Sequence, residues 1–153
     1  MKFWCDQMLG GLARWLRILG YDTHYEKSGS SAILYGKSLA ESRLFITRSG
    51  FFHNKAKAVV VRSEKIEELL AELKEIIALD LTLDLSRTRC ATCNGELREI
   101  TVDDLSEAFK QDHSGTISRY SDFSQCIACR KIYWVGVHFK QIEETLTKAR
   151  EII

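Results

Sequence analysis

The sequence contains no proline, no internal repeat and no low-complexity segment, so no linker of that kind marks a boundary along its 153 residues. It also lacks any apolar run approaching the roughly 18 residues that a membrane-spanning helix needs. The N-terminus, MKFWCDQMLG, carries an acid at Asp6 and no small-residue cleavage site, which is unlike a secretory signal peptide. These absences favour a cytoplasmic chain without a membrane partner, folded as one ordinary domain or two small ones.

The chain also has no large excess of charge of either sign, since its formal net charge is +1 at pH 7. The two signs are nevertheless unevenly distributed. Residues 1–62 contain ten Lys and Arg but four Asp and Glu, whereas residues 63–84 contain two basic and seven acidic residues. The basic N-terminal portion suits a phosphate-rich partner, but a basic surface is also common on small domains that bind none.

Strand and helix patterns alternate over residues 1–84. Apolar residues recur at helical spacing within residues 8–19 and 66–77, with Ser63 placed to cap the second helix, and another helix is predicted at 31–42. Short apolar segments predicted as strands lie at 2–5, 23–25, 43–47 and 58–61. This order predicts an α/β domain whose parallel sheet is covered by helices on both faces. The predicted core includes Leu12, Leu16, Leu19, Val60, Leu69 and Leu73.

The pattern changes near residues 80–85 (DLTLDL), which we predict to join the α/β domain, 1–84, to a second domain, 85–153. In this second part the capping-box pair Thr101 and Asp104 predicts a short helix. A terminal helix is predicted over 138–152, with Ile142, Leu146 and Ala149 on one face. Between these helices we expect a loop at 113–115 and strands at 117–124 and 131–135, after an earlier strand at 96–100.

Two CxxC pairs provide the most specific motif, namely Cys90, Cys93, Cys126 and Cys129. Each pair lies in a hairpin-like setting, and two such turns can close a tetrahedral zinc site as in a zinc ribbon. Four thiolates leave no open coordination position, so the predicted zinc is structural. A thioredoxin-type pair would lie between a strand and a helix, and a cytoplasmic chain disfavours disulfides. Cys5 lies in an apolar strand and is expected to be an unreactive core thiol.

Several segments resemble the Mut-seven C-terminal RNase family. They are DQMLGGLARWLRILGYDT (6–23), RLFITR (43–48), RCATCNG (89–95) and CIACRKIYWVGVH (126–138). They occur in order over nearly the whole chain, and the first and last are specific. The resemblance implies a PIN-like nuclease domain followed by a zinc ribbon, in a family of predicted metal-dependent ribonucleases.

Members of such a family bind Mg²⁺ or Mn²⁺ through carboxylates clustered at strand ends, and Asp6 matches this role. The alternative is that Asp6 only caps the following helix. The resembling family has acids at the start of its second helix and after its Thr-Arg motif. This chain has Ser30, Ser31 and Ser49 at those places. The predicted Mg²⁺ or Mn²⁺ site at Asp6 has therefore lost negative charge, unless Glu26 or Glu41 compensates.

Five basic residues are candidates for contacting an RNA backbone: Arg14, Arg17, Arg48, Lys55 and Lys57. The alternative for each is an ordinary solvated side chain. Tyr133 and Trp134 could stack on bases, but aromatic residues beside a zinc site more often belong to a core.

Three hypotheses follow for the function. The first in preference is a PIN-like protein that binds RNA and cleaves it weakly or not at all. The alternatives are an active metal-dependent endoribonuclease using Asp6 with Glu26 or Glu41, and a non-enzymatic module that docks a protein partner through its zinc ribbon. The number of carboxylates near Asp6 discriminates the first two, and a basic surface discriminates RNA binding from protein docking.

Overall fold

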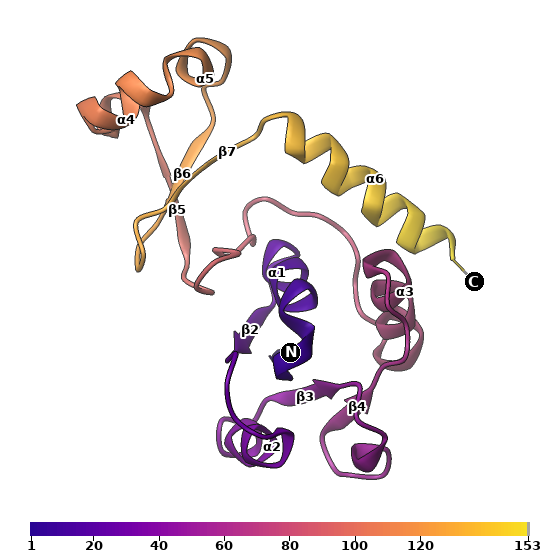
Figure 1. Ribbon diagram of the computed structural model, residues 1–153. Coiled ribbons are helices and arrows are strands. Elements are labelled where there is room, and N and C mark those ends of the chain that lie inside the picture. The colour runs from indigo at the N-terminus through magenta and orange to yellow at the C-terminus, as the bar shows by residue number, and fades with distance from the viewer. Residues whose placement is uncertain (153) are drawn as a thin grey trace.

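A computed structural model describes residues 1–152 and confirms the predicted α/β fold (Figure 1). Its four-stranded sheet has the order β2-β1-β3-β4, and every neighbouring pair is parallel. All four strands therefore end at the same edge of the sheet. The bounds are β1 Lys2–Cys5, β2 Asp22–Tyr25, β3 Leu44–Thr47 and β4 Ala58–Val60.

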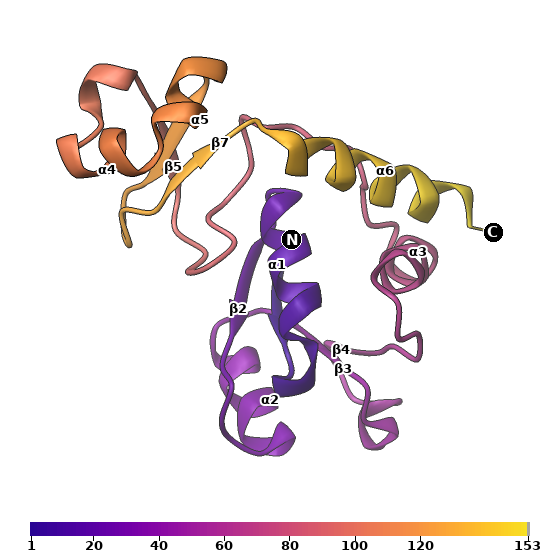
Figure 2. The same cartoon turned by 45° about the horizontal axis from the view of Figure 1, so that its top comes forward.

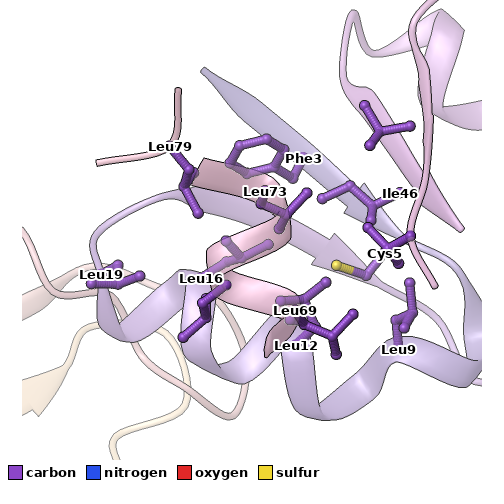
Figure 3. Packing of buried hydrophobic residues seen from close by; sticks show 14 of the residues in the cluster. Phe3, Cys5, Leu9, Leu12, Leu16, Leu19, Ile46, Leu69, Leu73 and Leu79 are labelled. Carbon is purple, nitrogen blue, oxygen red and sulfur yellow. The ribbon is translucent and has the colours of Figure 1, made fainter. Parts of the chain in front are cut away.

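Helices cover both faces of this sheet because successive strand side chains point to opposite sides. Phe3, Cys5 and Ile46 face α1 and α3 and join the larger core cluster (Figure 3). Trp4 and Phe45 face the other way, toward a smaller cluster with α2 and η2. The helices are α1 Gly10–Ile18, α2 Ser31–Ala40 and α3 Ile66–Ile77, and the 3-10 turns are η1 Gln7–Leu9 and η2 Gly50–Phe52.

The C-terminal helix α6, Val137–Glu151, returns from the ribbon to the α/β half and lies against α3 (Figures 1 and 2). Its Leu146 and Ala149 are fully buried in the larger core cluster, and Ile142 packs against that cluster. The predicted apolar face of this helix is thus confirmed. The division into domains at 1–84 and 85–153 stays a prediction. Helix α6 belongs to the second range by sequence but packs on the core of the first.

Two local expectations in the α/β half are wrong. Val60 is only half-buried, because β4 lies at the edge of the sheet, and its neighbours Val59 and Val61 are buried instead. Ser63 does not cap α3, whose N-cap is Lys65. The Ser63 backbone N–H donates to the Glu72 carboxylate, so the acidic helix holds the incoming chain by a different contact.

The second sheet is the antiparallel ribbon β5-β6-β7, formed by Leu97–Ile100, Phe123–Cys126 and Ile132–Trp134. The predicted capping box of Thr101 and Asp104 is present at the 3-10 turn η3, Val102–Asp104. The expected loop at 113–115 and strand from 117 are wrong, because α5, Ser114–Arg119, follows α4, Glu107–Asp112, and places Ile117 on the ribbon's apolar cluster. Within residues 1–152, every helix is too short or too polar to cross a bilayer.

Candidate metal centre and strand-end site

The structure brings the four predicted cysteines together at one end of the ribbon. Their sulfur atoms all lie within 4.8 Å of one another, with 3.7 Å between Cys90 and Cys129 and 3.4 Å between Cys93 and Cys126. Four thiolates bound to zinc at 2.3 Å in a tetrahedron lie ~3.8 Å apart. The cluster therefore fits zinc, and it is the one group of three or more metal-ligating side chains found within residues 1–152.

The two CxxC turns have the same backbone geometry. In the first, Asn94 N–H donates to Cys90 C=O at 2.8 Å, and in the second Arg130 N–H donates to Cys126 C=O at 3.0 Å. Asn94 and Arg130 both adopt φ 70°, the left-handed conformation that ends each turn. Gly95 follows Asn94, and a Cβ there would lie 2.6 Å from Cys126 Sγ. A side chain at residue 95 would thus enter the sulfur cluster.

The surroundings of Cys90 favour its thiolate. Burial alone would raise the pKa of Cys90, but the Tyr133 hydroxyl at 3.0 Å and the backbone N–H groups of Cys93 and Thr92 outweigh burial and lower it to about 6. Tyr133 is therefore engaged with the cysteine cluster. Because four thiolates leave no open coordination position, a zinc ion held here would be structural and would tie the two turns together.

Asp6 lies directly after β1, at the edge where all four strands end. Its side chain is fully buried and accepts three hydrogen bonds. Oδ1 accepts from Gln7 N–H at 2.8 Å, so Asp6 is also the N-cap of η1, as the structural alternative expected. Oδ2 accepts from Ser31 Oγ at 2.6 Å and from Thr47 Oγ1 at 2.7 Å. The strand-end site thus consists of Asp6, Ser31 and Thr47.

The three serines have different environments. Ser31 begins α2 and contacts Asp6 directly, whereas Ser30 is the N-cap of α2 and accepts from Ile33 N–H. The Ser49 backbone N–H donates to Thr47 Oγ1 at 3.0 Å, which orients the Thr47 hydroxyl. Sequence reasoning did not identify Thr47. Its position at the end of a strand parallel to β1 was the signal that could have found it.

Glu26 and Glu41 are held by basic neighbours. Glu26 contacts Lys37 and His24, both at 3.2 Å, and hydrogen bonds from Lys37 and then His24 lower its pKa. Glu41 pairs with Arg43 at 3.4 Å. Neither joins Asp6 in a group of three or more carboxylates within residues 1–152. Asp6 is thus a single buried carboxylate that already accepts hydrogen bonds from two hydroxyl groups. Such a site does not fit Mg²⁺ or Mn²⁺, which prefer several oxygen ligands.

The predicted basic residues divide by exposure. Arg14 on α1 and Lys57 before β4 are exposed, and Lys55 is exposed with its Nζ 5.1 Å from the centre of the Phe51 ring. Arg48 is half-buried and donates to the carbonyls of Arg62 and Ser63. Its side chain lines a cavity of about 190 Å³ between α1 and the start of α3.

Arg17 differs from these four because it is only 6% exposed. Its guanidinium donates to the carbonyls of Thr23 at 2.9 Å, Ala91 at 3.0 Å and Thr92 at 3.3 Å. Burial lowers its pKa. The side chain thus joins α1 and β2 to the first CxxC turn and does not face solvent.

Asn94 of the same turn completes this joint at the edge strand β2. Its Oδ1 accepts from Thr23 N–H at 3.0 Å, and its Nδ2 donates to Asp22 Oδ1 at 2.7 Å. Arg43 also donates to Asp22 Oδ1, at 2.8 Å. Although burial would raise the pKa of Asp22, hydrogen bonds from Arg43 and Asn94 outweigh it and lower the pKa. The metal-binding turn is therefore fixed to the sheet by polar contacts that also cover an open strand edge.

No curated protein and no solved structure matches the chain. One family model does match, and it covers both the strand-end site and the four cysteines. That match, to the Mut7-C RNAse domain over residues 1–146, shows that the chain belongs to this ribonuclease-like family.

Proposed function

We propose that this protein is a PIN-like member of its family that binds RNA and cleaves it weakly or not at all. One observation carries the proposal. The acid that follows β1, Asp6, is fully buried, and its carboxylate accepts hydrogen bonds from the hydroxyl groups of Ser31 and Thr47. Membership of a ribonuclease-like family supports RNA as the partner.

Metal-assisted cleavage needs a cation that activates water and neutralises charge on the phosphate. To reach Asp6, a cation would have to displace donors at 2.6 and 2.7 Å from a carboxylate with no exposed surface. Each hydrogen bond to a charged group contributes about 1.5–3 kcal/mol, so this displacement is costly. The Ser31 and Thr47 hydroxyls are neutral and would offer little charge in return. These arguments favour a structural Asp6.

A surface suited to single-stranded RNA lies near the same edge of the sheet. Phe51, in η2 just after β3, is 71% exposed and presents a ring on which an unpaired base can stack. Lys55 lies beside this ring, and Lys57 is also exposed. Arg48 lies at this edge too, whereas Lys57 precedes β4 at the opposite edge of the sheet and Arg14 lies on α1. The proposed RNA surface comprises the Phe51 ring, Lys55 and these more distant cations, and it combines aromatic and positive groups.

Cleavage is tested by restoring the missing acids. With Mn²⁺, we expect wild type and Asp6→Asn to cleave a labelled single-stranded RNA equally slowly. The Ser31→Asp, Ser49→Asp double variant places new carboxylates near Asp6 and should cleave about tenfold faster or more, as electrostatic stabilisation of a transition state allows. Gel analysis of the products measures the rates. Strong wild-type cleavage that Asp6→Asn abolishes would overturn the proposal of weak catalysis.

Binding is tested by removing exposed charges. The double variant Lys55→Gln, Lys57→Gln should weaken RNA binding about fivefold. It should also reduce the slope of log affinity against log salt concentration by about 1.4, because each lost phosphate contact on a single strand reduces that slope by ~0.7. The matched control, Lys65→Gln with Lys74→Gln, removes two exposed charges from the acidic α3 region and should change little. Fluorescence anisotropy over a salt series gives both values. Equal losses in the two double variants would contradict the proposed surface.

A further inference from the structure

A cavity lies in the ribbon half, and neither Asp6 nor any of the four clustered cysteines lines it. Its volume is about 560 Å³, and its lining comes from α5, the end of β7 and the start of α6. Ligand sites for small molecules typically measure about 300–1,000 Å³. The lining includes Arg119, Tyr120, Trp134, Val137 and His138.

Trp134 and Tyr120 form the aromatic part of the lining. Trp134 is half-buried, and its ring packs at 5.8 Å from His113, 6.1 Å from Phe109 and 6.4 Å from Phe123, centre to centre. These neighbours fix the indole while it still borders the cavity. A rigid aromatic face of this kind can stack on any nucleobase, and such stacking loses little conformational freedom.

Gly136 explains how the chain passes so close to these rings. A Cβ at this position would lie 3.0 Å from the Trp134 indole and 3.7 Å from the Tyr120 ring. The absence of a side chain lets β7 turn directly into α6 beside the cavity. Trp134 at the end of β7 and His138 at the start of α6 thereby line the same cavity.

Arg119 provides the positive charge of the cavity lining, and the imidazole of His138 beside it can donate a hydrogen bond. Arg119 and His138 are exposed, and neither takes part in the ion pairs formed within residues 1–152. No Asp or Glu contributes to the lining. The first turn of the 15-residue helix α6 contains no acid, and its N-cap Gly136 offers no side-chain acceptor, so its N–H groups add positive potential.

We infer that this cavity binds one unpaired nucleotide, with the base against Trp134 and Tyr120 and the phosphate beside Arg119 and His138. Aromatic faces combined with cations recognise the two parts of a nucleotide, whereas a paired base inside a duplex cannot reach them. The nucleotide could belong to an RNA strand or be free, since the two share this chemistry. The inference does not depend on the proposed RNA surface around Phe51.

A single added charge tests the inference with little risk to the fold. Val137 is 69% exposed at the first position of α6, where an acid is favourable to the helix. Val137→Glu should therefore keep the protein folded while it repels a phosphate. The matched control is Leu85→Glu, because Leu85 is 51% exposed, lies outside both the cavity lining and the CxxC turns, and undergoes the identical charge change.

Zinc-loaded protein of residues 1–153 is titrated with a fluorescein-labelled octauridylate and with unlabelled uridine monophosphate as competitor. We expect Val137→Glu to weaken the binding of the octamer about tenfold, a loss in the range of one stacked base and one phosphate. The control should lose less than about twofold. A blunt RNA duplex of the same length should not compete for the site.

The outcomes separate the two proposals. If Val137→Glu weakens RNA binding and the Lys55→Gln, Lys57→Gln double variant does not, the result supports the cavity and contradicts the Phe51 surface. If the double variant alone weakens binding, the result supports the Phe51 surface and contradicts the cavity. Displacement by micromolar uridine monophosphate supports the cavity with a free nucleotide as its ligand. Equal affinities of Val137→Glu and Leu85→Glu for both probes would overturn the inference and would favour a protein segment as the occupant.

Discussion

Removing zinc from the cysteine cluster is expected to unfold the ribbon while leaving the α/β half folded. Cys126→Ser should lower the zinc content well below one ion per chain, because it takes one sulfur from a cluster whose four members lie within 4.8 Å. Structural zinc contributes on the order of 10 kcal/mol to the module that it holds. Within residues 1–152 the buried members of the ribbon's own apolar cluster are Ile100, Leu105 and Phe123, so this cluster offers little to replace the metal.

The expected unfolding is local, and hydrogen exchange can locate it. Amides of residues 97–134 should lose protection in Cys126→Ser, whereas those of α3 and α6 should keep it because Leu146 and Ala149 belong to the α/β core. Cys5→Ala is the matched control, since Cys5 is buried beside Phe3 and Leu9 and is no part of the cluster. It should retain one zinc per chain. Full zinc and unchanged melting in Cys126→Ser would contradict this prediction.

Short-range patterns made the fold and the cysteine cluster predictable from the sequence. The two CxxC turns are local, and each is closed by hydrogen bonds within six residues, so spacing alone indicated a metal site. Apolar periodicity likewise located α1, α3 and the strands of the parallel sheet. The segment 113–119 was predicted incorrectly, because its helix depends on contacts of Ile117 with residues far along the chain.

The strand-end site was only partly predictable for a related reason. The sequence singled out Asp6 and the serines, but the hydrogen bonds of Asp6 with Ser31 and Thr47 join residues 25 and 41 positions away. Whether a serine caps a helix, as Ser30 does, or contacts the acid, as Ser31 does, depends on how α2 meets the sheet. The pattern of residues along the chain does not show how α2 packs against the sheet.

Arg14 and Arg17 illustrate the same limit and provide a matched pair. Both lie on α1 three residues apart, and the sequence assigned both to RNA binding. Arg14 is exposed, whereas Arg17 is 6% exposed and donates to three carbonyls in β2 and the first CxxC turn. Methionine retains the aliphatic volume of arginine and its helix propensity, so Arg→Met isolates the loss of the guanidinium.

Arg17→Met is expected to lower the free energy of unfolding by about 3 kcal/mol, because it leaves buried carbonyls without donors. Arg14→Met should change it by less than about 0.5 kcal/mol, as is usual for an exposed site. Urea unfolding of the zinc-loaded proteins measures both values. Zinc content should stay at one in each variant, since the four cysteines are intact, while the Thr23 amide, which donates to Asn94, should exchange faster in Arg17→Met alone. Unchanged stability and unchanged Thr23 exchange in that variant would show that the CxxC turn is held to the sheet by its other contacts, with no need of the buried arginine.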